Sequence, residues 1–303
     1  MWHILKRKAK IKENYMKILI IGGDERFSHL AASLDKKGVD VCAYALPVPS
    51  HVKVCTSLDG ALSLCDTVIL PLPLSRDGHF INTPQSDEKT EIDRVFSRLG
   101  KGKVILAGKV SPAIKNKAQQ YGLRIFDYYE CESFTDENAY ITAEGGLQIA
   151  MLNTEKTLRD SAHLIIGAGR IAKHLLLLLH GVGAHVTLAC RNRHDILWAR
   201  SLGASVADLA GESEDLEKSI SLCDVIYNTV PEQLIPDECC KLIKKGALYV
   251  ELVGDEGLLI EPLRARAKCI CAKALPPSYA PESASRLLYR AVLETLEGRV
   301  NVK

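Results

Sequence analysis

Leu164-Ile-Ile-Gly-Ala-Gly-Arg-Ile-Ala172 is an apolar strand that runs into Gly167-x-Gly169-x-x-Ala172 and then into a Leu-rich helix. A second apolar strand follows over 184–190. In this order the first glycine permits a tight turn and the second lets the backbone approach a pyrophosphate. The small Ala172 lets the helix pack closely on the strand. The helix N-terminus then offers free N–H groups to phosphates. The pattern predicts a dinucleotide-binding βαβ unit.

The cofactor is predicted from the end of the second strand. NAD sites usually carry an Asp or Glu about 20 residues beyond the glycine motif, but no acid lies between Arg170 and Arg193. The strand ends at Arg191-Asn192-Arg193, and two arginines suit a 2′-phosphate. We therefore expect NADP (NADPH) as the cofactor, with NAD less favoured; the alternative is a solvated basic turn. The expected contacts around the motif are Gly167, Ala168, Gly169, Arg170, Ile171, Arg191, Asn192 and Arg193.

Length and composition limit the class of protein. The chain has 303 residues, of which 47% are hydrophobic and 25% charged, as in a soluble globular protein of two ordinary domains. A net charge of +2 argues against nucleic acid as a partner. No apolar run is long enough to span a membrane. We expect a cytoplasmic protein without a membrane partner.

Residues 1–15 carry five basic residues and one acid, and they lack the apolar core of a signal peptide. We expect a basic, disordered extension or a wrongly assigned start, because a complete strand begins directly after Met16. The chain also has ten cysteines but no C-x-x-C pair and no nearby histidine. We expect reduced core cysteines and no metal site.

Strands and helices alternate from residue 16 onward, which predicts an α/β fold with two doubly wound Rossmann-like domains. The second domain carries the GxGxxA motif. The expected division is a substrate domain over 16–150, an NADP-binding domain over 151–282, and a C-terminal bridging helix and tail over 283–303. A connecting helix is expected over 139–154. Apolar spacing over 283–297 predicts an amphipathic helix that returns to the first domain.

Ligands of such folds bind at the carboxyl ends of the strands. The loops at these ends in the first domain contain cations that could hold a small dianionic acid. The expected substrate-binding residues are Arg26, Ser75, Arg76 and Lys109. The alternative for each loop is a solvated turn.

Three residues are candidate proton carriers: Asp77, His79 and Glu144. Glu144 precedes two glycines, so its alternative role is to cap a helix start. In the second domain Asn228, Thr229 and Val230 follow a strand and are expected to line the nicotinamide side of the site. Their alternative role is a strand-ending turn set by Pro231.

Several motifs occur together in a specific order. They are Ile20-Ile-Gly-Gly-Asp-Glu-Arg26, Tyr140-Ile-Thr-Ala-Glu-Gly145, Leu164-Ile-Ile-Gly-Ala-Gly-Arg170, Asn228-Thr-Val-Pro231 and Leu275-Pro-Pro-Ser-Tyr-Ala-Pro281. Over residues 16–297 the chain resembles the A-subunit family of the dipicolinate synthases of spore-forming Firmicutes. The resemblance implies an NADP-linked dehydrogenase that acts with a flavodoxin-like B subunit. Its reaction would convert dihydrodipicolinate to dipicolinate for the spore.

Two runs depart from the family pattern. An Asp-Leu-Ala-Ser-x-Pro-Gly-Gly run of the family is replaced by Glu251-Leu-Val-Gly-Asp-Glu-Gly257, and a Leu-Pro-Gly by Leu275-Pro276-Pro277. Two alternative functions stay open. One is an NADP-dependent dehydrogenase of another small oxo-, amino- or hydroxy-acid, and the other is a non-catalytic NADP-binding subunit. We also expect a homo-oligomer.

Overall fold

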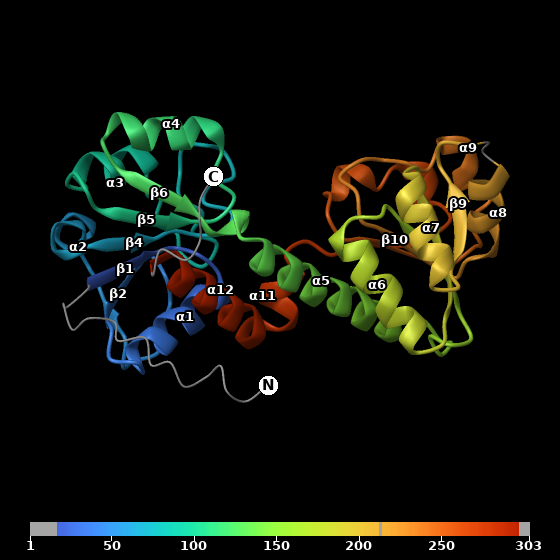
Figure 1. Ribbon diagram of the computed structural model, residues 1–303, viewed down its shortest axis with the longest axis horizontal. Coiled ribbons are helices and arrows are strands. Elements are labelled where there is room, and N and C mark those ends of the chain that lie inside the picture. Colours follow the sequence, from blue (N-terminus) through green and yellow to red (C-terminus); the bar gives the residue numbers. More distant parts are fainter. Residues whose placement is uncertain (1–16, 212–213, 297–303) are drawn as a thin grey trace. The chain divides into compact units, whose positions relative to one another are not determined.

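The structure is a computed structural model that describes residues 17–211 and 214–296 (Figure 1). The chain divides into two compact units. The first combines Met1–Phe134 with Pro281–Lys303, and the second is Thr135–Ala280. The division therefore lies 16 residues before the expected boundary at residue 150. The expectations for residues 1–15, and for the tail from residue 297, concern residues outside the described ranges.

The first unit is built on a six-stranded parallel sheet with the strand order β3-β2-β1-β4-β5-β6. The strands are β1 (Lys17–Ile21), β2 (Asp40–Tyr44), β3 (Lys53–Val54), β4 (Thr67–Ile69), β5 (Val104–Ala107) and β6 (Arg124–Asp127). The helices are α1 (Glu25–Asp35), α2 (Leu58–Leu64), α3 (Ile92–Arg98), α4 (Pro112–Gln120), the 3-10 turn η2 (Tyr128–Glu130) and α12 (Pro281–Leu296).

The second unit repeats this order, with the parallel sheet β12-β11-β10-β7-β8-β9. Its strands are β7 (Ala162–Ile166), β8 (His185–Cys190), β9 (Ser205–Asp208), β10 (Val225–Asn228), β11 (Leu248–Glu251) and β12 (Lys268–Cys271). Its helices are α5 (Glu132–Asn153), α6 (Arg170–Gly181), α7 (Arg193–Ser201), α8 (Glu214–Leu222), α9 (Asp237–Cys240), α10 (Glu261–Arg264) and α11 (Leu275–Tyr279), with the 3-10 turn η3 (Glu256–Leu258). Both orders are doubly wound, which confirms the predicted fold class.

The C-terminal helix α12 belongs to the first unit, where it packs on α1 (Figure 1). Its buried side chains include Leu287, Leu288, Ala291 and Val292, which recur at helical spacing. The apolar face of α1 includes Phe27, Leu30 and Leu34. The burial of these apolar side chains stabilises the unit in which α1 and α12 pack together. The apolar spacing over 283–297 likewise predicts that this helix returns to the first domain.

Helix α5 begins at Glu132, seven residues before the start that the sequence predicts. Glu144 therefore lies inside the helix, and the interpretation of Glu144 as a cap of the helix start is wrong. The misleading signal was the pair Gly145-Gly146, which usually weakens a helix interior. Here the glycines allow close packing. A Cβ atom on Gly145 would lie 3.2 Å from the Tyr279 ring, and one on Gly146 would lie 3.3 Å from Leu252.

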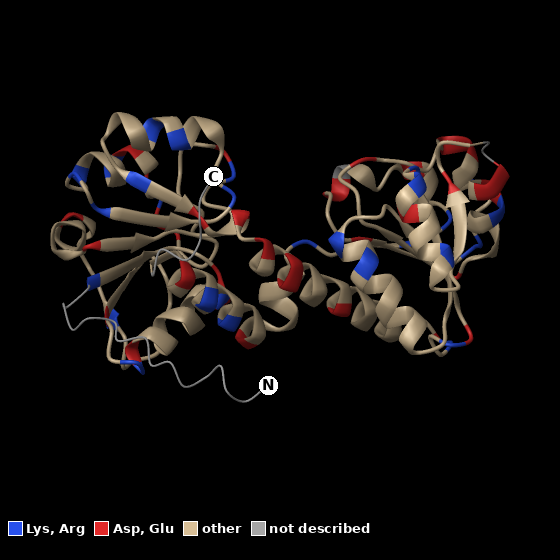
Figure 2. Ribbon diagram, viewed as in Figure 1, with Lys and Arg blue, Asp and Glu red and all other residues tan. Residues whose placement is uncertain are grey.

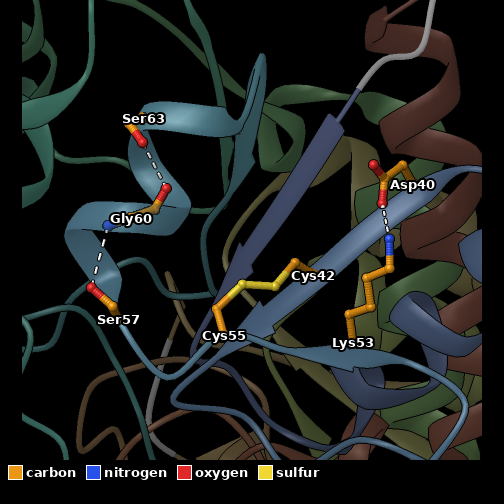
Figure 3. The surroundings of a disulfide bond; sticks show 7 residues. All are labelled: Asp40, Cys42, Lys53, Cys55, Ser57, Gly60 and Ser63. Carbon is orange, nitrogen blue, oxygen red and sulfur yellow. Dashed lines mark hydrogen bonds and ion pairs between the residues drawn. A yellow bond between two sulfur atoms is a disulfide. The ribbon is translucent and has the colours of Figure 1, made fainter.

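Cys42 on β2 and Cys55, which directly follows β3, form a disulfide, with their Cα atoms 6.1 Å apart (Figure 3). The expectation that all ten cysteines are reduced is wrong for this pair. Spacing alone could not reveal it, because the pairing of β2 with β3 brings residues 13 positions apart into contact. The other eight cysteines form no disulfide.

The charged residues are distributed as the small net charge of +2 leads one to expect. Lys and Arg are interspersed with Asp and Glu along the elements of both units (Figure 2). Within the described ranges, no helix has the length and apolar character needed to cross a bilayer. The same ranges hold no group of three or more His, Cys, Asp or Glu side chains that could bind a metal.

His163 is a buried histidine at the start of the second unit's sheet, with 1% of its surface exposed. Its ring stacks on that of Tyr227, and its Nδ1 lies 3.3 Å from the Tyr227 hydroxyl. Nε2 lies 3.2 Å from the Leu158 carbonyl oxygen. Burial lowers the pKa of His163 to about 4, although the bond to Leu158 opposes this shift. The folded state therefore favours the neutral ring.

This shift predicts a pH-dependent stability. The folded-state pKa lies below that of the unfolded chain, so the contribution is complete above about pH 6.5 and is lost as the pH falls toward 4. At pH 5 the loss is about 2 kcal/mol. His163→Asn should remove this part of the difference in unfolding free energy between pH 7.5 and pH 5.

Urea titrations followed by the fluorescence of Trp198, which packs on the same unit's core, measure the effect. His185→Asn changes an exposed histidine on β8 and should keep the full pH dependence of the unaltered chain. An unchanged dependence in the His163 variant would contradict the prediction.

Candidate functional site

The glycine motif forms the turn between β7 and α6 in the second unit. Gly167 has φ +102°, a conformation that L side chains rarely adopt, and its missing side chain leaves room for a neighbour. A Cβ atom there would lie 2.6 Å from Thr229 Oγ1 and 2.8 Å from Val230 Cγ1. Gly169 differs, because no atom lies within 4 Å of the position of its Cβ. Packing requires the first glycine, whereas the second faces open space.

Helix α6 begins directly after Gly169, which provides no side-chain cap. The turn and the uncapped helix start thus fit the pyrophosphate of a dinucleotide: the backbone is accessible, and the helix dipole favours an anion. Ala168 and Ile171 are half-buried and pack on the core, so only their backbone groups remain for such contacts. Arg170 is exposed at the helix start. These placements agree with the predicted phosphate site.

The turn after β10 lies against the glycine motif. The Thr229 hydroxyl donates to the Ile166 carbonyl oxygen at 2.7 Å, and the Thr229 N–H donates to the same oxygen at 3.0 Å. Asn228 is 1% exposed and forms hydrogen bonds within the protein. Its side chain therefore shapes the turn and is not presented to a ligand, contrary to the cofactor contact expected of it.

The end of β8 carries Arg191, Asn192 and Arg193, all exposed. The Asn192 side chain caps α7 by accepting from the His194 N–H at 2.8 Å. Neither arginine side chain has a hydrogen bond or an ion pair within the described ranges. Two unpaired guanidinium groups beside a strand end can bind a phosphate with charge-assisted hydrogen bonds.

Asp195 is the first acid after this basic turn, and it is already paired. The Lys173 ammonium lies 2.8 Å from the Asp195 carboxylate, of which 18% is exposed, and 5.4 Å from the centre of the Trp198 ring. The positive charge of Lys173 thus offsets the charge of this carboxylate. The residues that follow β8 are therefore basic, whereas an NAD site usually carries an acid near this position to bind the ribose hydroxyl.

The first unit has its own glycine turn after β1, but the chain closes it. The Gly23 N–H donates to the Asn82 carbonyl oxygen at 3.1 Å. A Cβ atom on Gly22 would lie 2.7 Å from Thr83 Cγ2. The loop that follows β4 thus occupies the space that a pyrophosphate would need. Of the two glycine turns, only the one after β7 leaves open space at a helix start.

Arg26 is 5% exposed and lies beneath the strand ends of the first unit. Its guanidinium binds the Asp24 carboxylate through two nitrogens, at 2.9 and 2.7 Å, and donates to the Leu72 carbonyl oxygen at 3.1 Å. Asp24 also caps α1. The predicted substrate contact of Arg26 does not fit this geometry, because its donors already hold α1 to the loop after β4.

Arg76 lies on an open pocket of the same unit, with a volume of about 340 Å³. The lining residues are Arg76, Asp77, Phe80, Ile81, Asn82, Thr83 and Pro84. The exposed Arg76 guanidinium is oriented by a hydrogen bond of 3.3 Å from Nε to the Asn82 side-chain oxygen. An arginine that is held but exposed at a pocket could bind a carboxylate there.

Ser75 and Asp77 form the turn that carries Arg76. Asp77 Oδ1 accepts from the N–H groups of Phe80 and His79 and from the Ser75 hydroxyl, at 2.8–3.0 Å. The bonds from Phe80 and His79 lower the pKa of Asp77 to about 2. A carboxylate that is held ionised is a poor proton carrier near neutral pH, so the geometry favours a structural role for Asp77. His79 is exposed beside it.

Lys109 follows β5 in a left-handed conformation, with φ +56°. Asp127 fixes this strained backbone by accepting from the Lys109 and Val110 N–H groups, at 2.9 and 2.7 Å. The exposed Lys109 ammonium has no ion pair among the described residues. The Leu74 N–H donates to the Gly108 carbonyl oxygen at 2.8 Å, so the loops carrying Arg76 and Lys109 are joined.

Glu144 lies on α5 in the second unit, close to Tyr279 on α11. Burial, followed by the charge of Glu144, raises the pKa of Tyr279. The phenol therefore stays protonated beside the carboxylate. Two of the sequence motifs, far apart in the chain, thus meet in one unit.

Sequence reasoning missed three functional candidates. The sequence patterns assign no role to Tyr279 or to Lys173, whose partners lie on other elements. They mark Glu251 only as a departure from the family pattern. The role of Glu251 could have been predicted from the sequence. Glu251 ends one strand and Asn228 ends the strand before it, and a carboxylate beside an amide side chain can accept a hydrogen bond from it.

The comparisons with known proteins extend this geometry. Residues 17–129 match the family of N-terminal domains of the dipicolinate synthase A subunit. The chain is 21% identical to the A subunit of dipicolinate synthase from Bacillus subtilis (strain 168), over 93% of this chain and 96% of that protein. The resemblance to the A subunit of dipicolinate synthase is confirmed.

Solved structures show the same fold. The dipicolinate synthase A subunit from Bacillus halodurans superimposes with a TM-score of 0.78 at 18% identity, covering 93% of this chain and 97% of that one. An L-alanine dehydrogenase matches with a TM-score of 0.58 at 13% identity, covering 93% and 89% of the two chains. The two-unit α/β architecture is thus shared with a dehydrogenase.

The two glycines of the motif should respond differently to alanine. Gly169→Ala adds a methyl group to open space at an ordinary φ of −72°. The melting temperature should not change, but NADPH affinity should fall by at least about tenfold, because the methyl group occupies the phosphate approach. Thermal unfolding and a fluorescence titration with NADPH measure the two effects.

Gly167→Ala is the matched control, because the same methyl group meets Thr229 and Val230 at a positive φ. It should destabilise the second unit by roughly 2 kcal/mol or more. Equal NADPH affinity in Gly169→Ala and the unaltered chain would exclude this turn as the phosphate site.

Proposed function

We propose that this protein is an NADP-dependent oxidoreductase that converts dihydrodipicolinate to dipicolinate. The observation that carries the proposal is the second unit's open helix start at Gly169, with the unpaired Arg191 and Arg193 at the end of the neighbouring strand β8. The similarity to the A subunit of dipicolinate synthase supports the choice of reaction.

The proposed reaction removes two hydrogens from the dihydropyridine ring. One ring carbon gives up a hydride, for which bound NADP is the acceptor. A neighbouring ring position loses a proton, and the electron pair of that bond completes the aromatic ring. The products are dipicolinate, NADPH and a proton. Because aromatisation supplies the driving force, the protein mainly has to orient the ring and accept a proton.

The first unit supplies the groups proposed for the substrate. Dihydrodipicolinate carries two carboxylates, and Arg76 and Lys109 offer two cations on loops that the Leu74–Gly108 hydrogen bond joins. Arginine can bind a carboxylate with two parallel hydrogen bonds, whereas lysine acts as a point charge. We assign one carboxylate to each.

The proton acceptor is proposed among Glu144 and His79. Asp77 is excluded from this role here because its carboxylate closes a turn and has a pKa of about 2. Glu144 is half-buried and lies close to Tyr279, whereas His79 is exposed near Arg76. A carboxylate or an imidazole suffices, since the reaction requires no strong base.

The Bacillus subtilis relative is designated the A component of its synthase, which implies a second component. We propose that this chain works with a flavodoxin-like B subunit, that the chain itself forms a homo-oligomer, and that the complex operates in the cytoplasm of the sporulating cell.

A direct assay tests the proposal. The purified protein, with and without a B-type subunit, is mixed with enzymatically made dihydrodipicolinate and NADP, and the formation of NADPH and dipicolinate is followed by absorbance. Equal amounts of both products are expected. NADPH binding without turnover would favour a non-catalytic subunit, and turnover only with other oxo-, amino- or hydroxy-acids would favour a different dehydrogenase.

Cofactor preference depends on the basic turn. Arg191→Gln and Arg193→Gln should each weaken NADP binding about 10- to 100-fold, because each removes a charged contact to the 2′-phosphate. NAD binding should change little. Calorimetric titration of both cofactors gives the ratio, and Arg200→Gln, which changes an exposed arginine farther along α7, should leave it unaltered. NAD affinity equal to or above that of NADP in the unaltered chain would contradict the prediction.

The substrate contact is tested at Arg76. Arg76→Ala should raise KM for the dicarboxylate and lower kcat/KM about 10- to 150-fold, as expected for the loss of a charge-assisted contact. NADPH affinity and melting temperature should be unchanged, because an exposed arginine contributes little to folding. Arg98→Ala removes another exposed arginine of the same unit and should keep full activity. Full activity in the Arg76 variant would exclude this pocket as the substrate site.

A further inference from the structure

Glu251 is a completely buried carboxylate to which the proposed chemistry gives no role. It ends β11 and has 0% of its surface exposed. Within the described residues, no Lys, Arg or His forms an ion pair with it. Burying a carboxylate is costly unless hydrogen-bond donors replace the lost water. The donors around Glu251 therefore indicate what this side chain does.

Three donors surround the carboxylate, and they come from two strand ends. Oε2 accepts from Asn228 Nδ2 at 2.7 Å. Oε1 accepts from the N–H groups of Val253 and Gly254 at 3.1 and 2.7 Å. One side chain thus binds the last residue of β10 and the backbone of the turn that follows β11.

Asn228 links Glu251 to the turn after β10 through further hydrogen bonds. It lies opposite Glu251 in the β10–β11 ladder. Its Nδ2 also donates to the carbonyl oxygens of Val230 and Glu232, at 2.9 and 3.3 Å, and its Oδ1 accepts from the Val230 N–H at 3.2 Å. The same turn contributes Thr229 and Val230, the two residues that fill the space above Gly167.

The turn after β11 is adapted to the longer acid. The Ser of the family's Asp-Leu-Ala-Ser run falls on Gly254, where a Cβ atom would collide with the Leu258 side chain and lie 3.1 Å from Glu251 Oε1. Glu251, Gly254 and Leu258 therefore fit one another, and the departures from the family pattern form one coherent arrangement.

We propose that Glu251 is a positioning residue for the nicotinamide half of the cofactor site, which it organises by fixing the turns after β10 and β11. The inference rests on the proposed function. A doubly wound sheet holds the two nucleotide halves over its two sets of strands. The turns fixed by Glu251 follow β10 and β11, whereas Arg191 and Arg193 follow β8, on the other side of β7.

Glu251→Gln tests this role with almost no change in shape. If the Gln oxygen accepts from Val253 and Gly254, its amide nitrogen faces the Asn228 amide, and two donors oppose each other. The turn after β10 should then lose its support. Adenosine 2′,5′-bisphosphate occupies only the adenosine half, so its affinity should stay within about twofold, while NADPH affinity should fall about tenfold.

Calorimetric titrations of the full chain with both ligands measure this separation. Glu256→Gln is the matched control, because it makes the same change five residues later on a side chain that is 79% exposed, and it should bind both ligands normally. If Glu251→Gln does not fold, Glu251→Asp keeps the charge with a shorter reach. It should show the same selective loss, at about threefold.

Unchanged NADPH affinity in the Glu251 variants would overturn the proposal. Equal losses for NADPH and the bisphosphate would also overturn it, because Glu251 would then support only the fold. Failure of the unaltered chain to bind either ligand would overturn the proposed function, and this inference with it; that outcome is distinguishable because it needs no variant.

Discussion

The Ile166 carbonyl oxygen accepts two hydrogen bonds from Thr229, and the geometry of the candidate cofactor site depends on this contact. It lies at the β7–β10 junction, where the order of strands in the second sheet reverses. Bound there, Thr229 and Val230 cover Gly167, which in turn requires a residue without a side chain. Gly169 and the start of α6 are left facing open space. The open start of α6, which is the candidate anion site, is thus shaped by one carbonyl oxygen that accepts two hydrogen bonds.

The two units share a strand order, but the glycine turn at the point where this order reverses is covered in the first unit and open in the second. In the first unit the residues after β4 return over the glycine turn, and Asn82 and Thr83 fill it. The same loop then carries Arg76 to a pocket. In the second unit the turn after β10 is short and leaves the helix start uncovered. The same strand order therefore carries a candidate binding site for a carboxylic acid in the first unit and a candidate dinucleotide-binding site in the second.

Local patterns predicted most of the fold because they depend on residues close in the chain. Apolar runs located the long strands, and the GxGxxA motif located the turn before α6. Contacts between distant residues could not be predicted in this way. Arg26 is a cation at a strand end in the sequence, but its pairing with Asp24 and Leu72 depends on how two loops meet. The same limit explains the Cys42–Cys55 disulfide and the glycines inside α5, whose reasons lie in partners on other elements.

Helix α12 gives the first unit a discontinuous sequence, with a consequence for synthesis on the ribosome. The helix α1 precedes the whole second unit in the chain, whereas its partner α12 follows that unit. Domains generally fold as they emerge, N-terminal first, yet here the second unit is completely translated before α12 is made. Until α12 has emerged, α1 lacks this neighbour, so the nascent N-terminal part has a surface on which chaperones could act.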